Sequence, residues 1–111
     1  IQDRGVFSYV REQFPDIAIH CSTQMNITSR YGAEFMKQQG ATRVVTAREM
    51  SLAEIRAIKE HVDIEVETFV HGAMCYSYSG QCLMSSLAGG RSGDVAHSHA
   101  GNAMTKAICY P

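Results

Sequence analysis

Acidic, imidazole and thiol side chains gather in one short stretch of this sequence. Glu67 lies in a run of β-branched and aromatic residues with alternating carboxylates, and His71 follows this run. Cys75 and Cys82 come next, seven positions apart, with two tyrosines between them. Cys75 and His71 could form a thiolate–imidazolium pair for nucleophilic catalysis if the loop folds back. The two thiols could instead bind a soft metal or iron, and packing as free thiols under a loop is the purely structural alternative.

A β-strand must position these groups. Residues 64–70 are mostly β-branched or aromatic, with carboxylates at alternate positions, which predicts a strand. The alternation places Glu65 and Glu67 on one face and the aliphatic side chains on the other. An inward carboxylate near a strand end is a candidate general acid or base. An ion pair with a cation such as Arg48 is the alternative, and for Glu65 it is the one we expect.

Helix and strand signals alternate before this strand. The helices are indicated by apolar residues at helical spacing and the strands by short apolar runs. The predicted strands are the end of one at residues 1–3 and the segments 17–23, 43–47 and 64–70; the predicted helices are 4–14, 28–39 and 51–61. We therefore expect an α/β fold with four parallel strands, three helices and right-handed crossovers, followed by an irregular C-terminal tail. The pattern allows an open doubly wound sheet and part of a (β/α) barrel equally.

Local signals set the ends and the inner faces of these helices. Gly40 is expected to supply the left-handed cap that ends the second helix. The predicted N-terminal caps are Asp3, then Asn26 or Thr28, and Ser51, the last in a capping box with Glu54. The residues expected to face the core are Tyr31, Phe35 and Met36 in the second helix, and Leu52, Ile55 and Ile58 in the third.

Polar side chains follow the ends of the other predicted strands. His20 and Gln24 come at and after the end of the second strand, and Arg48 follows the third. Because the carboxyl ends of parallel strands meet at one edge, where ligands usually bind, we expect substrate contacts there. Tyr76 and Tyr78 could line the same groove. A structural histidine, ion pairing of Arg48 with a neighbouring helix, and loop packing of the tyrosines are the alternatives.

Composition limits the classes of protein to which the chain can belong. With 111 residues and a net charge of −1, it is large enough for one small domain. It has no apolar run long enough to cross a bilayer and no basic run that would mark a nucleic-acid site. Four cysteines without a secretory context indicate thiols or metal ligands and a cytoplasmic setting. The chain does not begin with Met and stops at Pro111, so we expect a fragment.

The stretch around the two cysteines resembles the signature of peptidase family U-32, the collagenase-like proteases. All of its specified positions are met, and so many at fixed spacing are more specific than a short motif. Residues 20–24 and 47–51 also resemble family segments, so the similarity covers residues 1–93. The signature positions are Glu67, Phe69, Gly72, Ala73, Met74, Cys75, Gly80, Cys82, Met84 and Ser85. The resemblance implies that 1–93 is a fragment of a TIM-barrel-like catalytic domain.

The family name implies a peptidase that acts on a protein or peptide substrate. Glu67, His71 and Cys75 would be its catalytic residues, and the place of Glu67 in the signature favours a functional role for it. The sequence has neither a His-Glu-x-x-His zinc motif nor a Gly-x-Ser-x-Gly elbow. Peptide hydrolysis is therefore implied by the resemblance alone, and a fragment could be inactive by itself.

The resemblance also implies an alternative function. Some proteins that the chain resembles are oxygen-independent hydroxylation proteins that act on RNA or ubiquinone precursors and hold an iron–sulfur cluster on four cysteines. By that likeness Cys75 and Cys82 would be two ligands of a 4Fe–4S cluster in the full-length parent, because thiolates bind iron well. We expect no complete cluster on this fragment alone. Its partners would be the substrate and the remainder of its own domain, without a membrane.

The tail, residues 94–111, departs from the family pattern. Family members usually have a third cysteine at a position that falls near Ser98 here. His97, His99 and Cys109 are present, but no spacing rule favours them as substitutes. A shifted reading frame and genuine divergence both explain such an abrupt change, and sequencing the gene across codons 91–98 decides between them.

Overall fold

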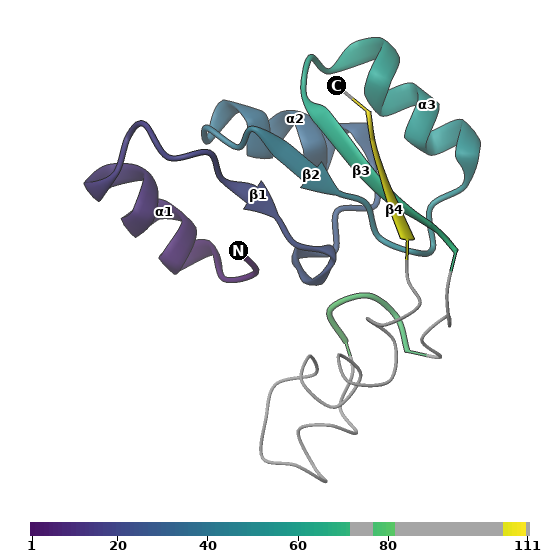
Figure 1. Cartoon of the computed structure of the whole chain (residues 1–111), viewed down its shortest axis with the longest axis horizontal. Coiled ribbons are helices and arrows are strands. Elements are labelled where there is room, and N and C mark those ends of the chain that lie inside the picture. Colours follow the sequence, from purple (N-terminus) through teal and green to yellow (C-terminus); the bar gives the residue numbers. More distant parts are fainter. Residues whose placement is uncertain (72–76, 82–105, 111) are drawn as a thin grey trace, which may run out of the picture.

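The described part of the molecule contains a sheet with helices along one of its faces and the first helix beyond one edge (Figure 1). The structure is a computed structural model that describes residues 1–71 and 77–81, together with the backbone of residues 106–110. The helices are α1 (Arg4–Gln13), α2 (Arg30–Gln38), α3 (Leu52–His61) and the 3-10 turn η1 (Thr23–Met25). The strands are β1 (His20–Cys21), β2 (Arg43–Val45), β3 (Glu65–His71) and β4 (Lys106–Tyr110).

The sheet has the strand order β1-β2-β3-β4, with β1, β2 and β3 parallel. The α/β class, the three helices and the parallel strands are thus confirmed, whereas four parallel strands were wrong. Residues 1–3 do not form a strand in the structure, although the Ile1 amino group donates to the His20 carbonyl and the Ser22 N–H donates to the carbonyl of Ile1. The strand predicted at 17–23 is likewise reduced to β1.

The tail is not irregular throughout, because residues 106–110 form β4 and pair antiparallel with β3. In the register, Glu67 lies opposite Cys109 and His71 opposite Lys106, with a bulge between Phe69 and His71. The physical reason is that the outer edge of β3 offers free backbone donors and acceptors, which a further strand satisfies. Sequence periodicity within the tail does not carry that information.

Capping groups begin and end the helices much as expected. Asp3 accepts from the Val6 N–H, and Ser51 and Glu54 form a reciprocal capping box at α3. Gly40 has φ +96°, as its cap requires. The predicted cap of α2 was wrong: Ser29 accepts from the Gly32 N–H, while Asn26 is in the left-handed region and ends η1.

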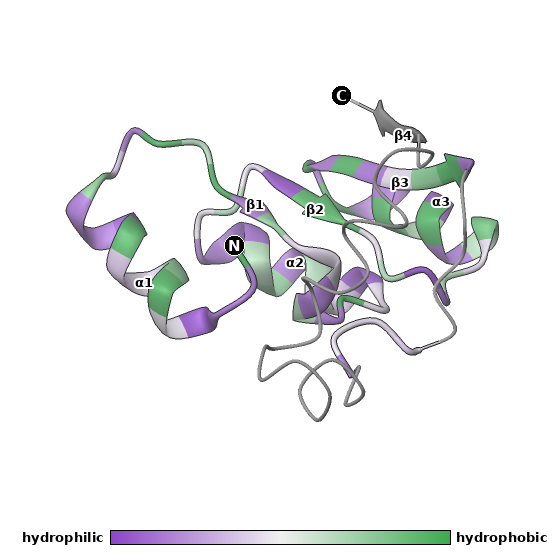
Figure 2. Cartoon of the chain, turned by 60° about the horizontal axis from the view of Figure 1, so that its bottom comes forward, coloured by the Kyte–Doolittle hydropathy of each residue, from purple (hydrophilic) through white to green (hydrophobic). Residues whose placement is uncertain are grey.

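The core lies between the sheet and the helices, and α2 and α3 cover the same face (Figure 2). Among the side chains buried there are Phe7, Cys21, Ala33, Met36, Val44, Ile58 and Val66. Met36 and Ile58 face inward as predicted, and Ile55 is partly buried. Tyr31, Phe35 and Leu52 are instead 66%, 48% and 81% exposed. In α2 the inward stripe contains Ala33 and Met36, which turns Tyr31 and Phe35 outward.

No helix in the described ranges is long and apolar enough to cross a membrane.

Candidate functional site

The turn at residues 77–81 folds back to the segments that follow β1 and β2. Ser79 at its centre is fully buried. Its N–H donates to the Glu49 carboxylate at 2.8 Å, and its hydroxyl lies 3.3 Å from the same oxygen. In Figure 1 this turn, drawn in green, lies below the sheet, beyond the carboxyl ends of the parallel strands. The edge at which the sequence predicts ligand binding is therefore where the turn is fixed.

Arg48 holds the same turn from its other side. Its guanidinium donates to the Ser77 carbonyl at 2.7 Å, and its backbone N–H donates to the Ser79 hydroxyl at 3.2 Å. Arg48 was predicted to bind substrate. The structure places it at the expected edge, the carboxyl ends of the parallel strands, where it binds another segment of the protein. The pair Arg48–Glu49 thus binds the turn through both side chains and one backbone group.

Gly80 brings the turn against the segment after β1. Its φ is +73°, and a Cβ built at this position would lie 2.6 Å from the Gln24 carbonyl oxygen. Only glycine tolerates both conditions, because a side chain adds strain at positive φ and here also a clash. The signature glycine therefore has a structural reason. Gln24, predicted to bind substrate, supports the turn through this carbonyl, and its side chain accepts from Ser22 at 3.2 Å.

Glu67 lies on the face of the sheet opposite the helices, in an ion-pair group with Arg43 and Glu65. Arg43 donates to Glu65 through Nε at 2.8 Å and contacts Glu67 through Nη1 at 3.2 Å. The Arg43 and Glu67 side chains are largely buried, whereas Glu65 is about half exposed. The ion pair expected for Glu65 is present, but its partner is Arg43, since Arg48 points to the turn. Residues directly paired in a sheet share a face, which explains the choice.

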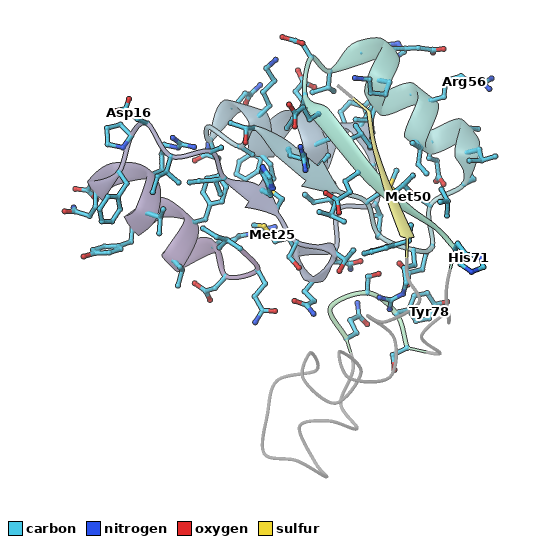
Figure 3. The ribbon with its side chains drawn as sticks, in the orientation of Figure 1. Asp16, Met25, Met50, Arg56, His71 and Tyr78 are labelled. Atoms are coloured by element: carbon cyan, nitrogen blue, oxygen red, sulfur yellow. The ribbon has the colours of Figure 1, made fainter. Side chains whose placement is uncertain are left out.

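The other predicted site residues are spread along the same edge and face. His20 is exposed and pairs in register with Arg43. His71, at the end of β3, and Tyr78, in the turn, are both exposed and lie at the same end of the sheet (Figure 3). Cys75, Tyr76 and Cys82 fall outside the described residues. No group of three or more His, Cys, Asp or Glu side chains suited to a metal ion occurs within residues 1–71 and 77–81.

Cys21 is excluded as a ligand or nucleophile. Its side chain is fully buried in the core. Burial raises the pKa of the Cys21 thiol to about 11, although the nearby N-terminal amino group acts in the opposite direction. A thiol must lose its proton to attack or to bind a metal, so Cys21 is a packing residue.

Comparison with known proteins bears on the same stretch. The sequence profile of peptidase family U32 matches residues 1–97, which is most of the chain. The chain belongs to peptidase family U32. This match includes every signature position from Glu67 to Ser85. No solved structure matches the chain.

Relatives in the family carry names from two kinds of chemistry. The chain is 50% identical over 86 residues to the tRNA hydroxylation protein P of Haemophilus influenzae, covering 77% of this chain and 19% of the relative. It is 42% identical over 92 residues to the 23S rRNA 5-hydroxycytidine C2501 synthase of Escherichia coli, covering 83% and 14%. An uncharacterized protease of Methanocaldococcus jannaschii is 38% identical over 96 residues, with coverage of 82% and 23%. The chain thus spans about a fifth of the length of these relatives.

Sequence reasoning missed the residues that hold the turn. Glu49 and Ser79 were not predicted as site residues, and Arg43 was not predicted as the partner of the strand carboxylates. Their contacts join segments 22 to 31 residues apart, which periodicity within one segment does not detect. Gly80 was the available signal, because a fixed glycine in a signature often marks a position where one backbone approaches another.

Proposed function

We propose that this chain is part of an enzyme that hydroxylates RNA, and that it supplies part of an iron–sulfur site. The support is its membership of family U32 together with 42–50% identity to relatives named for tRNA and rRNA hydroxylation. The observation that extends the proposal to particular residues is the fixed turn 77–81 at the carboxyl ends of the parallel strands. Cys75 and Cys82 flank this turn in the sequence.

Cys75 and Cys82 suit the proposed cluster by their chemistry. They are thiols on either side of an anchored turn, and thiolates are the usual ligands of iron–sulfur clusters. When bound, such a cluster would supply one-electron transfer. Cys21 cannot join them, because it is buried on the helix-covered face. The remaining ligands of a four-cysteine cluster are left unassigned by the proposal.

The proposal places the parallel strands β1, β2 and β3 in a (β/α) barrel. Strands that follow one another in order, with crossover helices on the same face, are wound as in a barrel, whereas a doubly wound sheet has helices on both faces. The face that carries Arg43, Glu65 and Glu67 would then point to the barrel interior. Glu67 would act near the mouth of this interior, as a carboxylate held by Arg43.

RNA hydroxylation is favoured over peptide hydrolysis, which the sequence analysis put first. The peptidase interpretation is supported by the family name and by the relative named as an uncharacterized protease. Its proposed pair would be Cys75 and His71, of which His71 is exposed. The RNA interpretation is supported by the greater identity to the relatives named for RNA modification. Action on ubiquinone precursors remains a prediction.

In this proposal the chain supplies groups for the reaction, and other parts of the enzyme supply the groups that bind RNA. Its net charge is −1 and it has no basic run, so phosphate contacts would come from elsewhere in an enzyme of the relatives' size. Because the proposed substrate is cellular RNA, we also propose that the enzyme acts in the cytoplasm.

The test is to delete the gene that encodes this chain and to measure hydroxylated pyrimidine nucleosides in total RNA by mass spectrometry. We expect one such nucleoside to disappear and to return when the gene is restored. The purified protein, kept free of oxygen, should contain iron and acid-labile sulfide. Unchanged RNA in the deletion strain, with peptide cleavage that Cys75→Ala abolishes, would replace this proposal with the peptidase.

A further inference from the structure

The geometry points to Tyr78 as a stacking surface for the pyrimidine base that is hydroxylated. Tyr78 stands in the turn 77–81 and is 71% exposed. The inference deepens the proposed function and rests on it for the identity of the ligand, a nucleobase of RNA. The presentation of the ring rests on described residues alone, because an exposed aromatic side chain stands on a turn that the protein holds in place.

The first support is that the backbone on both sides of Tyr78 is fixed. On one side, the Arg48 guanidinium donates to the Ser77 carbonyl at 2.7 Å. On the other side, the Ser79 N–H donates to the Glu49 carboxylate at 2.8 Å. A ring whose backbone is held before the ligand arrives loses less conformational freedom on binding, so the ligand binds more tightly.

The second support is that the turn does not need an aromatic residue at this position. The neighbours of Tyr78 are of the small kind that turns usually contain: Ser77, Ser79 and Gly80. Ser79 is fully buried and Gly80 lies against the Gln24 carbonyl, so the turn packs inward through these two residues. Tyr78 contributes little to that packing, because it is mostly exposed. Its ring is therefore available to a ligand at the carboxyl ends of the parallel strands.

The third support is the match between the ring and a nucleobase. Proteins that recognise unpaired bases of RNA stack them on aromatic side chains, histidine included. Residues 77–81 carry no charge, so the turn suits the face of a base rather than a phosphate. His71, a second exposed ring, lies at the same end of the sheet as Tyr78 (Figure 3). Such a contact orients the base that reacts, while the phosphates bind elsewhere in the enzyme.

Two other tyrosines are exposed to a similar extent but lack these features. Tyr31 in α2 is 66% exposed, and the Arg30 guanidinium lies over its ring, 4.7 Å from the centroid. Tyr9 is 62% exposed in the middle of α1, which lies beyond the edge of the sheet (Figure 1). Tyr9 is therefore the matched control for Tyr78.

The experiment restores the gene to the deletion strain as the parent or as a variant. It measures the rate at which the hydroxylated pyrimidine nucleoside appears in RNA after expression is induced. Tyr78→Ala removes the ring, Tyr78→Phe keeps it, and Tyr78→Leu replaces it with an apolar side chain that has no aromatic face. The control is Tyr9→Ala. Thermal unfolding and amide exchange at Ser79 verify that each purified variant is folded and keeps the turn.

The expected results follow from the loss of one stacked base. For Tyr78→Ala we expect the rate of hydroxylation to fall about 5- to 150-fold. Tyr78→Leu should lose nearly as much, because an aliphatic side chain cannot stack. Tyr78→Phe should retain most of the rate, and Tyr9→Ala should match the parent.

A second readout reports the contact directly. A short single-stranded RNA that contains 5-iodouridine is irradiated with the purified protein, and the cross-linked residue is located by mass spectrometry. This base joins to aromatic side chains on which it is stacked. We expect a cross-link at residue 78 in the parent and in Tyr78→Phe. Arg48→Ala should lower its yield, because that change releases the Ser77 carbonyl.

Hydroxylation at the parental rate in folded Tyr78→Ala or Tyr78→Leu protein would overturn the inference. A parental cross-link that never maps to residue 78 would overturn it as well. In either case, loss of the nucleoside on deletion of the gene would leave the proposed function standing. Failure of the proposed function has a different signature. Deletion would then leave the nucleoside unchanged, and the inference would fall with the proposed function.

Discussion

The backbone N–H of Ser79 donates a 2.8 Å hydrogen bond to the carboxylate of Glu49, 30 residues earlier in the chain. This bond joins the loop after β3, within the stretch that carries the family signature, to the segment after β2. Ser79 is fully buried while Glu49 is exposed, so the carboxylate covers a polar group that would otherwise lack a partner. The loop that connects the two signature cysteines is thereby held at the carboxyl ends of the parallel strands.

Gly80→Ala should detach this turn. The new Cβ would lie 2.6 Å from the Gln24 carbonyl oxygen at a φ of +73°. Strain of this kind costs about 1–3 kcal/mol, and we expect the turn to move rather than the sheet. Amide exchange at Ser79 should quicken while that at Val44 stays slow. Gly32→Ala in α2 is the control, because its Cβ meets only ordinary contacts and alanine favours a helix. Unchanged exchange at Ser79 would show that Gly80 is not needed.

The anchorage of the turn should weaken in acid. Burial raises the pKa of the Glu49 carboxyl, but backbone N–H groups of Glu49 and Ser79, with the Ser79 hydroxyl, lower it below its ordinary value of 4.5. Because the folded pKa is the lower one, the stabilisation is present above 4.5 and is lost as the pH falls through the folded value. In the parent, the protection of the Ser79 amide from hydrogen exchange, corrected for its intrinsic exchange rate, should therefore decrease as the pH falls below 4.5. In Glu49→Gln this protection should not change with pH. Equal pH profiles in the parent and in Glu49→Gln would contradict the role of the Glu49 carboxylate.

Arg43→Met should destabilise the sheet. It removes the cation shared by Glu65 and Glu67, which leaves two carboxylates on neighbouring positions of one face. Because Glu65 is about half exposed and solvent screens it, we expect a loss of about 1 kcal/mol in the free energy of unfolding at neutral pH. Urea unfolding at neutral pH measures this loss. An unchanged free energy of unfolding in Arg43→Met would contradict the ion-pair assignment.

Ser51→Ala should weaken α3 and the edge that it supports. Ser51 accepts from the Glu54 N–H, and Glu54 reaches back to the Ser51 N–H. Removing such a cap costs about 1 kcal/mol, which thermal unfolding followed by circular dichroism detects. Ser8→Ala in α1 is the control, since Ser8 is exposed inside a helix and alanine is neutral or better there. Equal melting temperatures for Ser51→Ala and the parent would refute the cap.

The helices and the parallel strands could be predicted because their signals are local. Asp3, Gly40 and the Ser51–Glu54 box act within a few residues of their own position. Inner faces were harder to predict: Leu52 is apolar yet 81% exposed, since it stands in the first turn of α3, ahead of the buried Ile58. Sequence periodicity indicates which face of a helix is apolar, and tertiary packing decides how much of that face is buried.

The site was less predictable because its contacts are not local. The sequence correctly predicted that Arg48 and Gln24 lie at the carboxyl ends of the parallel strands, but it predicted that both bind substrate. The structure gives Arg48 the Ser77 carbonyl and Gln24 the backbone of Gly80 as neighbours. Pairing of β4 with β3 is likewise a long-range event, and it replaced part of a tail expected to be irregular.

The measurement closest to the central claim is the level of hydroxylated nucleosides in RNA from cells that carry single cysteine variants in the gene. Cys75→Ser and Cys82→Ser should each abolish the modification, because the account makes both thiols ligands. Cys21→Ala should preserve it, because that thiol is fully buried and stays protonated up to a pKa of about 11. Parental levels of the modified nucleoside in both Cys75→Ser and Cys82→Ser cells would contradict the account.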